Sequence, residues 1–69
     1  MEQQAVTLGK NVIIGENVIL GKNISIGSNC IIEDNVVLND NVFIDSNTII
    51  RSNVTLGANA FVGSDCIIG

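Results

Sequence analysis

A chain of 69 residues is long enough for one domain with a small hydrophobic core. A net charge of −4, with three basic residues, argues against nucleic acid as a partner, because binding its phosphates requires a basic surface. A hydrophobic content of 46% argues against disorder, and apolar runs of at most three residues exclude a transmembrane helix.

The sequence is built from a six-residue repeat that starts at Val6. Residues 1–5 ("MEQQA") lie outside this register, and we treat them as an N-terminal extension before one repeat domain, residues 6–69. The domain divides without insertion or deletion into VTLGKN, VIIGEN, VILGKN, ISIGSN, CIIEDN, VVLNDN, VFIDSN, TIIRSN, VTLGAN, AFVGSD and CIIG. An internal repeat of this kind decides the architecture before any other feature.

Each six-residue unit predicts a short strand followed by a turn. Its first three positions alternate in, out, in, which predicts strands at residues 6–8, 12–14, 18–20, 24–26, 30–32, 36–38, 42–44, 48–50, 54–56, 60–62 and 66–68. Gly and Asn tolerate positive φ, so we expect both to shape the turns. The β-branched residues oppose a helix, and no two-residue hairpin turn is present. The remaining solution is an all-β, three-sided prism with 18 residues per coil and about three and a half coils.

The repeated pattern of Leu, Ile or Val, then Gly or an acid, two variable residues and a small aliphatic resembles the hexapeptide-repeat signature. Over residues 6–69 the chain is similar to the left-handed parallel β-helix of bacterial acyltransferases and of the C-terminal domains of sugar-nucleotide pyrophosphorylases. The left hand is implied by this resemblance alone, because most parallel crossovers are right-handed.

Coils of 18 residues sort the side chains into columns. One inward set is Leu8, Ile14, Leu20, Ile26, Ile32, Leu38, Ile44, Ile50, Leu56, Val62 and Ile68, and the other is Val6, Val12, Val18, Ile24, Cys30, Val36, Val42, Thr48, Val54, Ala60 and Cys66. Cys30 and Cys66 share a column two coils apart, so their Cα atoms are expected about 10 Å apart, beyond the roughly 7 Å limit for a disulfide. We expect reduced, unreactive core cysteines.

An Asn or Asp ends each complete unit and forms a ladder along each corner. The ladders are Asn11, Asn29, Asn47 and Asp65; Asn17, Asn35 and Asn53; and Asn23, Asn41 and Asn59. We interpret them as structural, because Asn holds turn conformations and can hydrogen-bond to its copy on the next coil.

The outward strand positions are the candidates for function. One side carries Ile13, Ile31, Ile49 and Ile67, a second carries Thr7, Ser25, Phe43 and Phe61, and the third carries Ile19, Val37 and Thr55. Aliphatic stripes in water usually mark a contact surface, although β-branched residues also simply suit strands. We favour an oligomer interface along the isoleucine side, with Phe43 and Phe61 as a second contact. The resemblance implies trimers with parallel prism axes.

The sequence lacks the catalytic groups that the resemblance would imply. The resemblance implies a histidine as general base in the acyltransferases, and three histidine ligands in related zinc-dependent carbonic anhydrases, but this chain has no histidine. No unit is interrupted by a loop, whereas the enzymes of the family tend to carry one. Glu33 and Asp45 lie on different corners and cannot share a proton or a metal. Glu33 is expected directly below Arg51, with Asp34 beside them, as a surface ion pair between coils.

We therefore expect a non-catalytic structural and oligomerisation module, a fragment or engineered minimal form of a hexapeptide-repeat transferase. We expect a homo-oligomer, preferably a trimer, in the cytoplasm, without cofactor, metal, nucleic-acid, membrane or small-molecule ligand. One alternative is an acyltransferase or pyrophosphorylase domain with ligand sites between subunits. A second alternative is a β-solenoid that assembles end to end, because the last coil offers unpaired strand edges.

Overall fold

The computed structural model describes residues 5–69 and contains only short strands and turns over that range. The predicted extension, residues 1–5, lies outside the described residues except for Ala5. The strands are β1 (Val6–Leu8), β2 (Ile13–Ile14), β3 (Ile19–Leu20), β4 (Ile24–Ile26), β5 (Ile31–Ile32), β6 (Val37–Leu38), β7 (Phe43–Ile44), β8 (Ile49–Ile50), β9 (Thr55–Leu56), β10 (Phe61–Val62) and β11 (Ile67–Ile68). Each strand falls within a predicted one.

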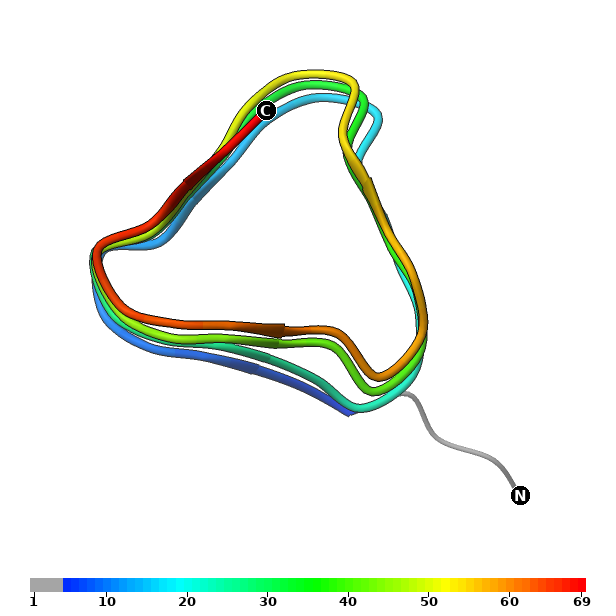
Figure 1. The fold of residues 1–69 in the computed structure, drawn as a ribbon, viewed down its shortest axis with the longest axis horizontal. Helices are drawn as coiled ribbons and strands as arrows, with labels where there is room; N and C mark the ends of the chain where they lie inside the picture. The colour runs from blue at the N-terminus through cyan, green and yellow to red at the C-terminus, as the bar shows by residue number, and fades with distance from the viewer. Residues whose placement is uncertain (1–4) are drawn as a thin grey trace.

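The strands stack into three parallel sheets that form the sides of a triangular prism. The sheet orders are β1-β4-β7-β10, β2-β5-β8-β11 and β3-β6-β9, and partners such as Ile13 and Ile31 lie 18 residues apart. In Figure 1 the chain runs clockwise while later coils lie nearer the viewer, which is a left-handed coil. The predicted left-handed parallel β-helix with 18-residue coils is therefore confirmed.

Backbone hydrogen bonds join each coil to the next in a repeating pattern. The Gly9 N–H donates to the Ile26 carbonyl at 2.8 Å, and one coil higher the Gly27 N–H donates to the Ile44 carbonyl at 2.7 Å. At the corners the direction reverses, and the Asn29 N–H donates down to the Lys10 carbonyl at 2.8 Å. Each strand of the middle coils is thus held by its neighbours above and below.

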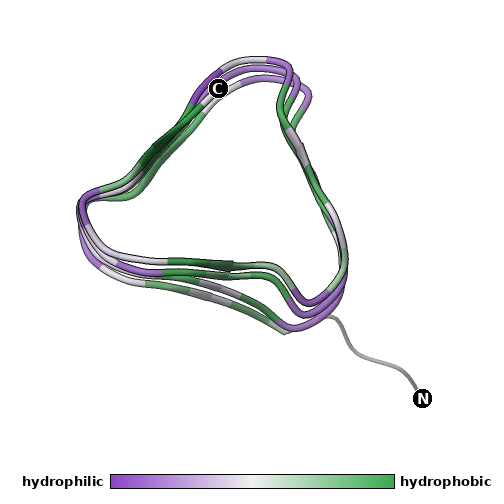
Figure 2. Ribbon diagram, in the orientation of Figure 1, coloured by the Kyte–Doolittle hydropathy of each residue, from purple (hydrophilic) through white to green (hydrophobic). Residues whose placement is uncertain are grey.

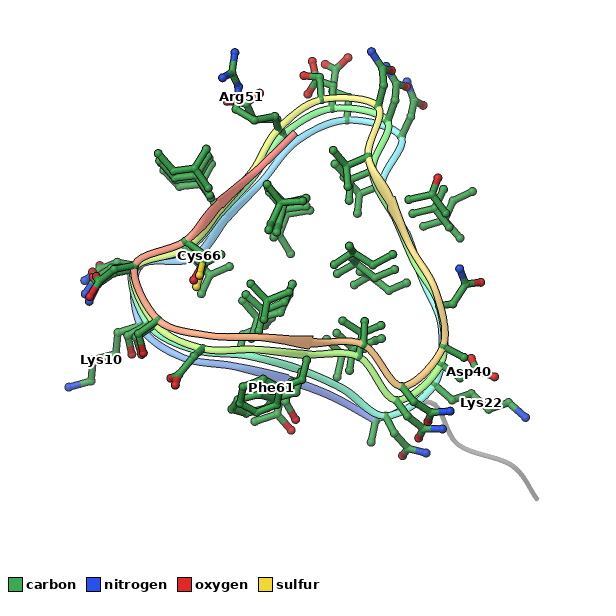
Figure 3. All side chains as sticks on the ribbon, in the orientation of Figure 1. Lys10, Lys22, Asp40, Arg51, Phe61 and Cys66 are labelled. Atoms are coloured by element: carbon green, nitrogen blue, oxygen red, sulfur yellow. The ribbon has the colours of Figure 1, made fainter. Side chains whose placement is uncertain are left out.

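The core is the interior of the prism, filled by the two inward sets. Figure 3 shows these side chains stacked on their copies inside the triangle, and Figure 2 shows apolar residues along the sides with polar residues at the corners. Ile32, Ile44 and Ile50 are fully buried in the middle coils. Buried Thr48 satisfies its hydroxyl by donating to the Gly63 carbonyl at 2.9 Å. Stacked branched aliphatics fill this interior without an aromatic residue.

The Asn ladders set the corners. All the positive-φ residues other than glycine end a six-residue unit, with φ between 59° and 66°: Asn11, Asn17, Asn23, Asn29, Asn35, Asn41, Asn47, Asn53, Asn59 and Asp65. Asn tolerates this left-handed conformation better than most residues. The Asn11 Nδ2 donates to Asn29 Oδ1 at 3.3 Å, and Asn23 Nδ2 to Asn41 Oδ1 at 3.2 Å. These bonds run along the corners from coil to coil.

The prediction that the turn glycines supply positive φ is wrong. Among the described glycines, only Gly69 has a positive φ. The turn glycines that are covered by a further coil are needed because that coil passes close to them. A Cβ on Gly15 would meet Asp34 Oδ1, and a Cβ on Gly27 would lie 2.7 Å from the Ser46 nitrogen. The Asn two positions after each of these glycines has the positive φ of the turn, while the glycine leaves room for the coil above.

Candidate functional site

The outward face of β2, β5, β8 and β11 carries the isoleucine column, which is defined as Ile13, Ile31, Ile49 and Ile67. The four residues pair in register, so their side chains stack along the prism axis. Ile13 is 60% exposed and Ile67 is 65% exposed, whereas Ile31 and Ile49 are half-buried between their neighbours in the column. The face is an unbroken apolar strip, one side chain wide, in contact with water.

The aromatic face, defined as the outward positions Thr7, Ser25, Phe43 and Phe61 of β1, β4, β7 and β10, combines polar and aromatic halves. The rings of Phe43 and Phe61 stack with centroids 5.0 Å apart and an interplanar angle of 26°. Figure 3 shows Phe61 outside the prism, and its side chain is 71% exposed while Phe43 is 38% exposed. The structure therefore places the two aromatic residues together, on a different side from the isoleucine column.

The third face is defined as Ile19, Val37 and Thr55 on β3, β6 and β9, and it carries two aliphatic side chains and one polar side chain. Ile19 is exposed at the first coil, Val37 is half-buried, and Thr55 replaces the aliphatic side chain at the last strand of this sheet. It offers a shorter apolar surface than the isoleucine column and provides a natural control for it.

Glu33 and Arg51 lie on adjacent coils at one corner, with Arg51 Nε 3.8 Å from Glu33 Oε1. The Glu33 carboxylate also accepts hydrogen bonds from the Ser52 N–H at 3.0 Å and the Ser52 hydroxyl at 3.2 Å. Asp34, expected to join them, instead accepts from the Glu16 N–H of the coil below at 2.9 Å. Because the Arg51 and Glu33 side chains are 58% and 38% exposed, water screens this pair.

A hydrogen-bonded motif at the corners was not predicted from the sequence. Ser28, Asp34, Asp40 and Ser46 each accept a hydrogen bond from a backbone N–H of the coil below, at distances from 2.8 to 3.1 Å. Each of them follows a turn glycine by 19 residues, and its side chain occupies the space that a Cβ on that glycine would need. The recurrence of Ser or Asp 19 residues after a turn glycine is the sequence pattern that could have predicted this motif. Its role is structural, because it satisfies corner amides.

Groups suited to catalysis or metal binding do not converge in the described part of the chain. Within residues 5–69 no three His, Cys, Asp or Glu side chains come together to hold a metal ion, and no pocket is present. Asp45 accepts from the N–H of neighbouring Ser46 at 2.8 Å, away from the Glu33 corner. Cys30 and Cys66 are free thiols that face inward, and the Cys30 thiol donates to the Asp45 carbonyl at 3.0 Å.

A parallel β-solenoid with one short strand per six residues and a left-handed coil is a hexapeptide-repeat fold. Comparison with known families agrees, since the model described as "Bacterial transferase hexapeptide (six repeats)" matches residues 5–40 and 35–69. The chain belongs to this family. No curated protein and no solved structure matched the chain. None of the described residues belongs to a helix long and apolar enough to cross a membrane.

Proposed function

We propose that this chain is a structural module that associates with copies of itself through the isoleucine column. The observation that supports this proposal is the column itself: four isoleucines in register, with the two outermost side chains 60% and 65% exposed. A protein surface rarely keeps a continuous apolar strip in water unless a contact covers it.

The size of the driving force can be worked from these exposures. Full burial of an isoleucine side chain contributes about 1.5–3 kcal/mol, so covering the open part of Ile13 or Ile67 contributes about 1–2 kcal/mol each. Ile31 and Ile49 add smaller terms because they are already half-buried. Contributions from two or three copies, set against the cost of association, support a reversible oligomer in which the column lies at the interface.

The column is better explained by a contact than by strand propensity. Val and Thr also favour strands, and the third face uses both of them at the equivalent outward positions. Nothing in strand formation requires the largest β-branched aliphatic at all four positions of one side and not of the others. A trimer with parallel prism axes, which the family resemblance implies, would bring three such columns together.

A catalytic role within the transferase family is the alternative, and the family description is what favours it. The chain has no histidine, which the family resemblance implies as the general base, so a transferase site here would need another side chain in that role or a base from a different chain. Binding of coenzyme A or a sugar nucleotide to the isolated chain, measured by calorimetry, tests this alternative. We expect no binding, and saturable binding would replace the structural proposal.

The test of self-association is the mass in solution by sedimentation over a dilution series, with and without the Ile31→Lys, Ile49→Lys substitutions. Both chains also carry Leu8→Lys, which charges the exposed lower end of the prism so that only lateral contacts contribute. The matched control is Val37→Lys, Thr55→Lys, which places the same two charges on adjacent coils of the third face. Circular dichroism verifies that both variants keep the strand signal. We expect a discrete oligomer that only the isoleucine-column variant dissociates. A parent chain that stays monomeric throughout, or equal dissociation of both variants, would refute the proposal.

A further inference from the structure

The two ends of the prism expose the interior that the middle coils bury. At the lower end the inward side chain of Leu8 is 46% exposed, whereas Ile44, two coils higher in its column, is fully buried. At the upper end the inward side chains of Leu56 and Ile68 are half-buried, whereas Leu38 and Ile50, one coil lower in the same columns, are fully buried. Each end is therefore an apolar surface bordered by strand edges.

The backbone edges at the two ends are complementary. Along one side, the Ile13 N–H donates to the Cys30 carbonyl at 3.0 Å, and the Ile49 N–H donates to the Cys66 carbonyl at 2.9 Å, always from the lower coil to the upper. The next donor in this series is the Ile67 N–H, and the matching acceptor at the lower edge is the Val12 carbonyl. One edge thus presents amides where the other presents carbonyls, at the same spacing.

The corner bonds repeat in the same way. The Asn47 N–H donates to the Ser28 carbonyl at 2.9 Å, and the Asp65 N–H donates to the Ser46 carbonyl at 3.1 Å. The series leaves the Ser64 carbonyl as an acceptor at the upper edge, and its counterpart is the Asn11 N–H at the lower edge. Both directions of hydrogen bonding are therefore matched between the two ends of one chain.

We propose that a second copy of this chain stacks on the first, with β1 and β2 of one copy placed on β10 and β11 of the other. In this register Thr7 takes the place of the residue 18 positions after Phe61, so Leu8 covers Val62 and Ile14 covers Ile68. In a longer chain, further coils of that chain would occupy the same edges.

This contact is heterologous, because it joins the upper end of one copy to the lower end of another. Such a contact does not close on itself when the stacking axis is straight, so it generates filaments instead of a defined oligomer. It uses the strand edges and the inward columns, and it is independent of the isoleucine column, which faces sideways. The two assemblies can therefore be separated by mutation.

The test starts from the Ile31→Lys, Ile49→Lys variant, so that lateral association does not contribute. We expect sedimentation to show a broad distribution that grows with concentration, and electron microscopy to show filaments. Adding Leu8→Lys, which charges the lower end, or Ile68→Lys, which charges the upper end, is expected to abolish growth. Circular dichroism checks that each variant is folded, and the growth of the starting variant tests the proposal without either end substitution.

A mixture of the two end variants gives the sharpest result. The Leu8→Lys variant keeps an intact upper end and the Ile68→Lys variant keeps an intact lower end, so together they are expected to form a one-to-one dimer of twice the 7.3 kDa chain mass. Monomers in the mixture, or a starting variant that stays monomeric at all concentrations, would overturn the stacking proposal. Neither result bears on the lateral contact, which is measured with the lower end blocked by Leu8→Lys.

Discussion

Replacing Gly27 with Ala tests the reason for glycine at the turns. A Cβ at Gly27 would lie 2.7 Å from both the nitrogen and Oγ of Ser46 and 2.9 Å from the carbonyl carbon of Asp45. Two of these three neighbours are backbone atoms, so a rotation of the Ser46 side chain cannot relieve the clash. Gly57 is the matched control, because a Cβ there has no neighbour within 4 Å. Neither glycine has a positive φ, so conformational strain of the alanine does not distinguish them.

The two substitutions should differ in sign. Overpacking at Gly27 costs about 1–3 kcal/mol, and the weakened hydrogen bond from the Ser28 N–H to Ser46 Oγ costs about 0.5–1.5 kcal/mol more. Alanine also lowers the conformational entropy of the unfolded chain, which stabilises the fold of either variant by about 0.4–1 kcal/mol. We therefore expect Gly27→Ala to lower the free energy of unfolding by about 2 kcal/mol and Gly57→Ala to raise it slightly. The unfolded-state contribution cancels between them, which leaves a difference of about 3 kcal/mol.

Urea titrations followed by circular dichroism measure this difference through linear extrapolation. They are best performed at one protein concentration, in the Leu8→Lys, Ile31→Lys, Ile49→Lys background, so that neither lateral nor end-to-end association contributes to the apparent stability. For a chain of this size a loss of about 2 kcal/mol corresponds to a fall in melting temperature of roughly 8–16 °C. Equal stabilities of the two variants would show that close approach of the coils is not the reason for glycine at Gly27.

The corners supply two further predictions. Asn47→Val should destabilise the fold by about 1–2 kcal/mol, because a β-branched residue is strained at φ 63°. Asn47→Gly should cost less, because glycine adopts this conformation without strain. Thermal melts of both variants measure the difference, and equal losses of stability would contradict the prediction. Arg51→Ala should change stability by less than about 0.5 kcal/mol, because its ion pair is exposed. Glu33→Ala should cost more, because Glu33 also accepts from the Ser52 N–H, and a larger loss from the arginine substitution in urea titrations would reverse this assignment.

The repeat made much of the candidate site predictable. A period of 18 residues, applied to the outward strand positions, predicts the isoleucine column on one side and the adjacent pair Phe43 and Phe61 on another. The structure places these residues in those columns. The same reasoning put Glu33 beneath Arg51. The contact of Asp34 was predicted wrongly, since it was expected beside Glu33 and Arg51, and that of Asp40 was not predicted. A carboxylate beside a turn can point up, down or outward, and only the structure shows that both accept a hydrogen bond from an amide of the coil below.

The sequence by itself determined the period, the three-sided coil and the division of residues into inward, outward and corner positions. It could do so because every coil repeats the same local pattern and a solenoid residue contacts chiefly its copies one coil away. Only the tertiary structure showed why glycine is needed at the turns, because the reason is the short distance from Gly27 to Ser46, or from Gly15 to Asp34, one coil above. Only the tertiary structure decided, too, how strongly each column is exposed, because equivalent residues such as Ile13 and Ile31 differ solely in which neighbours cover them.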